Sequence, residues 1–116
     1  MDFAKAIDIH VAWIKKLQEA ISGGEKLDPT MVCKDNLCKL GEWIYGEGKA
    51  HQNLAAYEPL KIKHAQFHQC AGDVVRKVNA GDVQGALAMV DTGGVFITVS
   101  TDTISAILKM KRELGL

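Results

Sequence analysis

The chain has 116 residues and a formal net charge of zero, with 14 Lys and Arg against 14 Asp and Glu. This length predicts a single domain over residues 1–116, because a second hydrophobic core would have too few residues to form. No basic run or arginine stripe could follow a phosphate backbone, so we do not expect nucleic acid binding. No apolar stretch approaches the ~18 residues of a membrane helix, and the N-terminus lacks the apolar region of a signal peptide, which predicts a cytoplasmic protein without membrane contact.

Three cysteines are present, Cys33, Cys38 and Cys70. Because three thiols cannot all pair within one chain, we expect reduced thiols or a metal ligand and not the disulfide framework of a secreted domain. The chain has two Pro, three Phe, two Trp and two Tyr, a composition that disfavours a β-sandwich or barrel.

The first segment, from Asp2 to Ile21, has apolar residues at helical spacing and predicts a helix that faces a bundle. His10 occupies the one step of this apolar stripe where a hydrophobic residue is missing. Ser22, Gly23 and Gly24 are expected to end the helix, since glycine readily adopts the positive φ of a helix C-terminus. A loop is predicted from there to Lys34.

A short helix follows, with Asp35 as the expected N-cap and Gly46 and Gly48 as its end. It carries Leu37, Cys38, Leu40, Gly41 and Ile44. Isolated helices shorter than ~12–15 residues are rarely stable in water, so other contacts must hold this segment to the bundle.

Three further helices complete the prediction. One begins around Pro59, ends at Asn79 and has His64 on its core face; the next, Val83 to Val90, is capped by Asp82. The residues Val95 to Ser100 favour a strand by propensity, but no second strand is available, so we extend them as a helix through Arg112. The predicted fold is all-α: an antiparallel four-helix bundle with an additional short inserted helix that carries Cys38.

His64 and His68 are four residues apart, the helical spacing at which two side chains can share a metal ion. An isolated pair of this kind is more often one histidine in a polar network and one in solvent. His10 adds a third imidazole directed to the bundle interior, where a polar ring needs a partner. Cys38 is the fourth candidate ligand, and three imidazoles with one thiolate form a closed tetrahedral set that zinc accepts.

The remaining candidates are assigned to packing. Trp13 and Trp43 are expected in the core or at its rim, because an indole is a poor metal ligand. His51 is expected to be a solvated loop residue, while Cys33 is either a small apolar residue or a thiol near Cys38. Cys70 points about 160° away from His68 around the helix, which favours a buried small residue. Gly41, one turn past Cys38, is expected to let the helix approach the metal.

The motifs His10-x-x-Trp13, Leu37-Cys38-x-Leu40-Gly41-x-Trp43 and His64-x-x-x-His68 resemble those of the chemoreceptor zinc-binding domain. The resemblance covers essentially the whole chain, including the Gly81-Asp82 turn and the segment from Phe96 to Ser100. It implies a four-helix bundle with one zinc ion held by His10, Cys38, His64 and His68. It also implies a sensory or regulatory role in bacterial signal transduction, without catalysis.

Domains of that family are typically attached to a chemoreceptor signalling module or a diguanylate cyclase, and they respond to zinc or oxidants in chemotaxis or cyclic-di-GMP signalling. This sequence contains neither module, so it is interpreted as a stand-alone version or an excised domain. The resemblance further implies a homodimer, with the first and last helices as its surfaces. We expect Cys38 to be a redox switch as well as a ligand, because a thiolate is the ligand that oxidants convert stepwise to sulfenic and higher acids.

There are two alternative functions. A zinc-stabilised helical bundle could serve only as a protein-interaction or dimerisation module. A metal enzyme is disfavoured, because hydrolytic zinc keeps an open position and di-iron bundles need Glu-x-x-His repeats, and this sequence has neither pattern. The physiological input, zinc or an oxidant, stays open at the level of sequence.

Overall fold

A computed structural model describes residues 1–23 and 26–116, and every regular element in these ranges is helical. Three helices are long: α1 (Phe3–Ile21), α4 (Tyr57–Asn79) and α6 (Val95–Glu113). The others are short: α2 (Pro29–Val32), α3 (Lys39–Tyr45), the 3-10 helix η1 (Glu47–His51) and α5 (Val83–Val90). The all-α prediction is confirmed.

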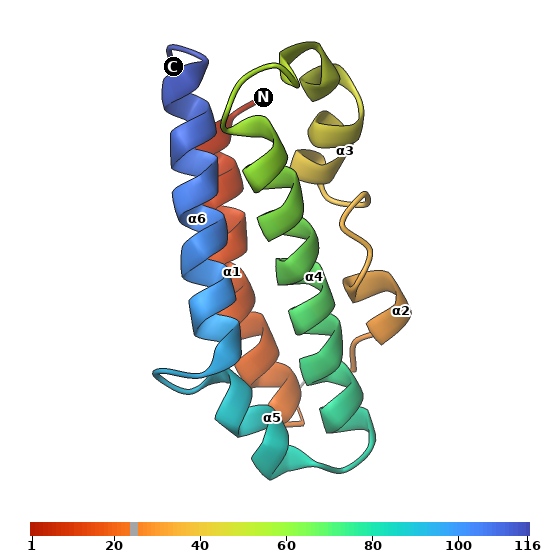
Figure 1. The fold of residues 1–116 in the computed structure, drawn as a ribbon. Helices are drawn as coiled ribbons and strands as arrows, with labels where there is room; N and C mark the ends of the chain where they lie inside the picture. Colours follow the sequence, from red (N-terminus) through yellow and green to blue (C-terminus); the bar gives the residue numbers. More distant parts are fainter. Residues whose placement is uncertain (24–25) are drawn as a thin grey trace.

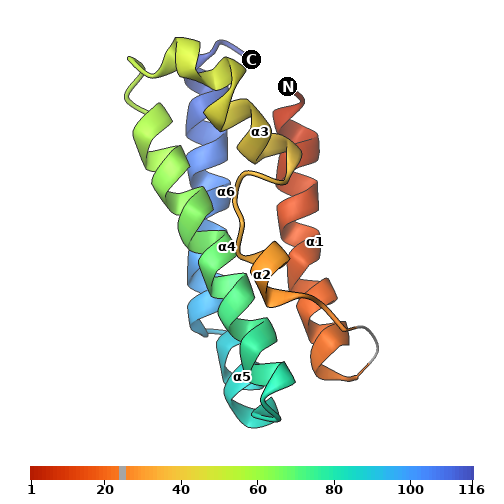
Figure 2. The same cartoon turned by 90° about the vertical axis from the view of Figure 1, so that its right-hand side faces the viewer.

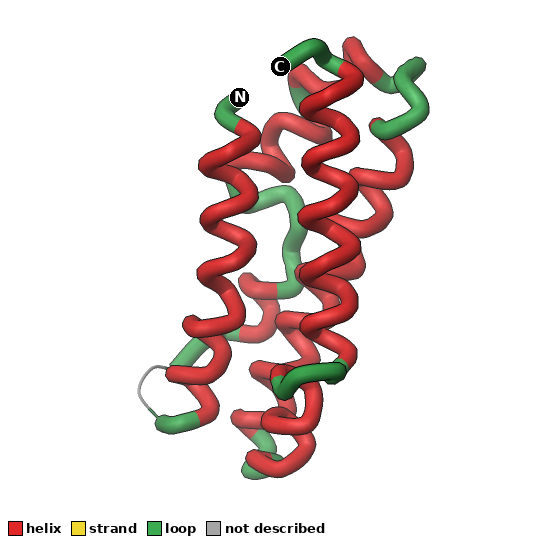
Figure 3. Tube along the Cα trace, turned by 90° about the vertical axis from the view of Figure 1, so that its left-hand side faces the viewer, coloured by secondary structure: helices red, strands yellow, loops and turns green. Residues whose placement is uncertain are grey.

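The long helices run side by side along a molecule of 44 × 25 × 19 Å (Figure 1). α1 and α4 point the same way, and α6 returns in the opposite direction to bring the two termini to one end. α2 and α3 cover the side of the bundle between α1 and α4, while α5 packs at the far end (Figure 2). The irregular links between these helices lie at the two ends and along this covered side (Figure 3).

Aspartate caps start several helices. Asp2, Asp28 and Asp82 each accept a hydrogen bond from a backbone N–H in the first turn that follows. The cap at Asp28, together with Pro29, forms α2 inside the segment that was predicted as a loop. α6 begins at Val95, which confirms the prediction that Val95 to Ser100 is helical. This β-prone stretch is stable as a helix because it buries Phe96 and Ser100 against the bundle.

The start of α3 differs from the prediction. Its N-cap is Cys38, whose Sγ accepts a hydrogen bond from the Gly41 N–H at 3.4 Å, and Asp35 lies outside the helix. A Cβ on Gly41 would lie 1.7 Å from the Asp35 carbonyl oxygen. Gly41 therefore allows the chain before α3 to fold against the helix, and this contact, not proximity to a metal, explains the glycine. Leu37 is exposed and does not pack on the bundle.

Gly23 ends α1 with φ +83°, as predicted for a glycine after a helix; Gly24 lies outside the described residues.

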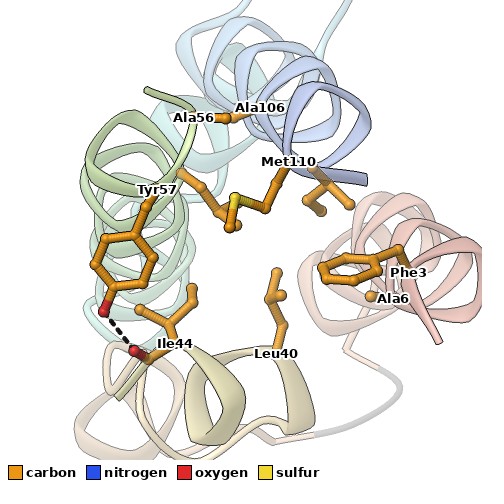
Figure 4. Close-up of a cluster of buried hydrophobic side chains, with 10 residues drawn as sticks. Phe3, Ala6, Leu40, Ile44, Ala56, Tyr57, Ala106 and Met110 are labelled. Atoms are coloured by element: carbon orange, nitrogen blue, oxygen red, sulfur yellow. Dashed lines mark hydrogen bonds between the residues drawn. The ribbon is translucent and has the colours of Figure 1, made fainter. Parts of the chain in front are cut away.

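The hydrophobic core has two clusters. The cluster near the two termini, here called the upper cluster, contains Leu40 and Ile44 of α3 and side chains from all three long helices (Figure 4). The lower cluster is centred on Phe67 and Phe96 and includes residues of α2 and α5. His10 lies on α1 between Ala6 of the upper cluster and Leu17 of the lower one. The histidines of the bundle thus form a polar layer between two apolar ones.

The sequence prediction that no stretch is long and apolar enough for a membrane helix is wrong, because one stretch meets both criteria. Val83–Glu113 contains an 18-residue window of mean hydropathy 1.3, of which 22% is buried. This stretch consists of two separate helices, α5 and α6, with Gly93 and Gly94 between them. One such stretch is a weak indication of a membrane helix, and no membrane contact follows from it.

Candidate metal centre

The structure brings together the four residues that the sequence singled out. His10 of α1 and His64 and His68 of α4 are 1%, 0% and 4% exposed, and Cys38 is half-buried at the start of α3. One ligand-type atom from each residue lies within 4.8 Å of the corresponding atoms of the other three. Three separate elements therefore converge on one point in the polar layer.

Four of the six distances among these atoms are close to those around a tetrahedral ion, and all six are within 4.8 Å. His64 Nε2 lies 3.2 Å from His10 Nε2, 3.1 Å from His68 Nε2 and 3.2 Å from Cys38 Sγ. Cys38 Sγ lies 3.7 Å from His68 Nε2. A tetrahedral zinc with ordinary bond lengths would separate two nitrogens by about 3.3 Å and a nitrogen from a sulfur by about 3.6 Å. The donor set fits zinc in both spacing and chemistry.

Hydrogen bonds on the far side of two rings fix which nitrogen faces the cluster. His10 Nδ1 donates to the Ala6 carbonyl oxygen at 2.7 Å, and His68 Nδ1 donates to the Val32 carbonyl oxygen at 2.9 Å. Because a carbonyl oxygen only accepts, each Nδ1 carries the proton, and each neutral ring directs an Nε2 lone pair at the cluster. Lone pairs held this close repel one another, and a cation between them would relieve this repulsion.

The electrostatics of the buried site favour neutral imidazoles. Burial is the largest cause that lowers the pKa of His10 and His68, and it lowers the pKa of His64 to about 2, helped by repulsion from the other two rings. Burial also raises the pKa of the Cys38 thiol, against hydrogen bonds from nearby backbone N–H groups that lower it. A metal ion would compensate by keeping the sulfur deprotonated.

Aromatic rings surround the cluster. The Phe67 ring packs edge-on against His10 and His68, with centroids 5.0 and 5.4 Å apart. Trp13 lies 6.5 Å from His68, half-buried, and the Lys16 ammonium lies 4.7 Å above its indole. Such apolar walls limit water around a metal site.

The other residues weighed from sequence lie outside the cluster. Trp43 packs edge-on against Phe3, in line with its predicted place in the core or at its rim. His51 was predicted to be a solvated loop residue, but it is half-buried and stacks on Trp43 with ring centroids 6.1 Å apart. Cys70 is buried in the lower cluster, as predicted. Cys33 packs against α4, where a Cβ on Gly72 would lie 2.8 Å from the Cys33 Cβ.

Two cavities open onto Cys38. One of about 150 Å³ lies between α1 and α3 and is also lined by His10 and Leu40. The other, of about 290 Å³, lies beside α2 and is also lined by His68 and Trp13. Cys38 is therefore part of the lining of two separate cavities.

The backbone carbonyl groups that hold two of the rings, those of Ala6 and Val32, were not predicted from the sequence. The Val32 carbonyl depends on α2, whose signal in the sequence is the Asp28-Pro29 pair at the start of a helix. The Ala6 carbonyl lies one turn before His10 in the same helix, which is a local relation that the sequence contains.

The fold and the cluster define an all-helical domain with a three-histidine, one-cysteine metal-type site. Residues 10–75 match the family described as the chemoreceptor zinc-binding domain, and the chain belongs to this family. The matched range includes all four clustered residues. This is a family of zinc-binding domains and is not a known catalytic family. No curated protein and no solved structure matches the chain.

Proposed function

We propose that His10, Cys38, His64 and His68 hold one zinc ion in a closed tetrahedral site. The observation that carries this proposal is the spacing of the three Nε2 atoms and the Sγ atom around a common centre. When bound, zinc joins α1, α3 and α4 and keeps the thiol deprotonated. Four protein ligands leave no position for a reactive water, which argues against a hydrolytic role.

The scaffold of this site is a single domain over residues 1–116. The sequence prediction counted Val83–Val90 (α5) among the four bundle helices and the Cys38 helix as an insertion. In the arrangement proposed here, α1, α4 and α6 occupy three positions, and the interrupted α2–α3 segment takes the fourth in place of α5. α2 and α3 together run antiparallel to α1 and α4, so that the short helix next to Cys38 is part of the bundle.

The domain serves, in this proposal, as a sensory or regulatory unit of cytoplasmic bacterial signal transduction. Membership of the chemoreceptor zinc-binding family supports this role, and the output is a fused or separate chemoreceptor or diguanylate cyclase module. The second candidate is a zinc-stabilised interaction module that senses nothing, which the fully buried histidines favour because structural zinc sites are closed.

Cys38 is the proposed redox switch within this site. In this proposal, hypochlorous acid reaches the sulfur through the two cavities that Cys38 lines. In net terms the thiolate gains the hydroxyl group and is oxidised by two electrons to a sulfenic acid, while the chlorine leaves as chloride. An oxidised sulfur binds zinc poorly, so oxidation removes the one ligand that comes from the α2–α3 segment.

The family resemblance also supports a homodimer through α1 and α6. Val11 on α1 and Leu108 on α6 are exposed apolar side chains that suit such a surface. Trp13 is half-buried against the lower cluster, as expected for a residue at the rim of the core, and Lys16 covers it, so it is not an exposed anchor for such a surface. Sedimentation of V11D and L108D should show loss of the dimer, while I62D on α4 should retain it; a wild-type monomer at high micromolar concentration contradicts the proposal.

Metal analysis tests the central proposal. Native mass spectrometry of the purified chain should show one zinc per chain. His64→Ala and His68→Ala should lose the metal, whereas the control His51→Ala should retain it, because His51 lies outside the cluster. Equal losses from all three variants, or a protein that stays free of metal in added zinc, would contradict the assignment.

Zinc exchange separates the sensor from the structural module. A sensory site should release zinc to a competing chelator, or after treatment with hypochlorous acid, without loss of the helical fold. A structural site should release zinc only when the chain unfolds, since there the metal and the fold are one equilibrium.

A further inference from the structure

His64 differs from the other two histidines of the cluster on the side that faces away from it. The Nδ1 atoms of His10 and His68 each donate to a backbone carbonyl, at 2.7 and 2.9 Å. His64 Nδ1 is buried and has no hydrogen-bond partner among the described residues. When the Nε2 lone pair faces a metal, Nδ1 must carry the proton, so a buried N–H group lacks an acceptor.

One other buried side-chain atom in residues 1–23 and 26–116 has no partner, and it is Ser100 Oγ. Ser100 lies on α6 and is 2% exposed. The threonines of the same helix each donate to the carbonyl four residues earlier, as Thr103 does to Val99 at 2.8 Å. The Ser100 hydroxyl makes no such bond, so its oxygen is available to a group on another helix.

Contacts between α4 and α6 place Ser100 at the level of His64. Thr103 Oγ1 donates to the Lys63 carbonyl oxygen at 3.0 Å, and the Phe96 and Phe67 rings pack 5.2 Å apart. α4 and α6 are antiparallel (Figure 1). His64 on α4 and Ser100 on α6 therefore both lie, along their helices, between the Lys63–Thr103 and Phe67–Phe96 contacts. Both side chains are buried, and α4 and α6 pack directly on each other.

We propose that Ser100 is a positioning residue for the zinc site, whose Oγ supports the His64 Nδ1–H through one buried water molecule that bridges the two atoms. This inference rests on the proposed function. This water-mediated hydrogen bond fixes the tautomer and the ring orientation of His64, as the Ala6 and Val32 carbonyls do for His10 and His68. It also satisfies the two buried polar atoms that otherwise lack a partner. The site is then supported from α1, α2 and α6.

The test compares S100A with S105A in the full chain loaded with zinc. Ser105 is exposed on the same helix, so S105A controls for the loss of a hydroxyl from α6. Competition with a chromophoric zinc chelator should show a roughly 10- to 100-fold weaker zinc affinity for S100A, the usual effect of losing such a support, and no change for S105A. S100T keeps an acceptor and should restore most of the affinity.

Nitrogen NMR of the imidazoles supplies a readout that a purely structural role would not change. In the wild-type protein the His64 Nδ1–H should give a slowly exchanging signal; in S100A the same proton should shift and exchange faster with water. Unchanged signal and affinity in S100A overturn this inference alone. If H64A keeps the wild-type zinc affinity, or the wild-type chain binds no zinc, both this inference and the proposed function fail.

Discussion

The long helices α1 and α4 and the α2–α3 segment contribute to the same site but are held in different ways. α4 has ten buried residues and contacts both core clusters, and two of those residues are His64 and His68. Between Val32 and Leu40, by contrast, no residue is fully buried, and Cys38 lies in this stretch. Three imidazoles are thus fixed by a continuous framework, whereas the thiol belongs to the link between two short helices.

Within the α2–α3 segment the two ends are well anchored. Leu40 and Ile44 are fully buried in the upper cluster, and the Tyr57 hydroxyl donates to the Ile44 carbonyl oxygen at 2.5 Å (Figure 4). Val32 is buried in the lower cluster. The short helix therefore has more apolar anchoring than its length and sequence predicted, and the weak part of the segment is the stretch around Cys38.

Zinc removal should have the largest effect, because it disconnects the two regions. Compared with the protein in micromolar free zinc, the chelated protein should have a free energy of unfolding that is lower by several kcal/mol. Structural zinc contributes ~10–16 kcal/mol in peptides, and its contribution is expected to be smaller where a hydrophobic core already exists. Urea unfolding with and without zinc measures this difference. An equal midpoint in both conditions contradicts a zinc link between α3 and the long helices.

Cys38→Ala should come next, since it removes one of the four ligands and leaves the three imidazoles in place. Hydrogen exchange should show the amides from Asp35 to Tyr45 losing protection first, with those from Ala71 to Val78 little changed. Cys33→Ala, five residues earlier and outside the cluster, is the control. If the whole chain loses protection together, zinc stabilises the entire fold and the proposed switch fails; if nothing changes, Cys38 is no ligand.

Ile44→Ala should destabilise the apolar anchor of α3 by about 2–5 kcal/mol, the usual cost of a cavity at a fully buried position. Unlike the loss of Cys38, this change should weaken the upper cluster whether or not zinc is bound. Urea unfolding of the variant in both metal states checks this prediction. The exposed Ile62→Ala is the control, and similar losses in the two variants would mean that α3 does not depend on its buried face.

Tyr45 should report a smaller effect, at the outer side of the α2–α3 segment. Its hydroxyl donates to the Asp35 carboxylate, and this bond is the largest cause that raises the pKa of Tyr45 from 10 to about 12. Because the folded state holds the Tyr45 proton more tightly than the unfolded state, the hydrogen bond to Asp35 stabilises the fold fully below pH 10. This contribution to the free energy of unfolding is lost as the pH rises from 10 through 12. Titration of tyrosinate absorbance should show a late transition, absent in Y45F and shifted toward 10 in D35N.

Local rules in the sequence accounted for the helical class, most helix boundaries and the four clustered residues. The apolar repeat in α1 placed His10 on the buried face, and the spacing of four placed His64 and His68 together, because both relations depend on the geometry of one helix. The cap at Asp82 and the end of α1 at Gly23 are local in the same sense.

Tertiary structure decided the features that depend on contacts between distant parts of the chain. The Val32 carbonyl reaches His68 only because α2 packs on α4, and Gly41 is required by the Asp35 carbonyl that folds over it. Val95 to Ser100 became helix because its apolar face is buried on α4 and no strand partner exists among the described residues. Sequence determined which side chains could bind a metal, since helical spacing fixes their direction. Packing decided how His68 is supported, because the Val32 carbonyl comes from another helix, whereas the Ala6 carbonyl that holds His10 belongs to the same helix and follows from the sequence.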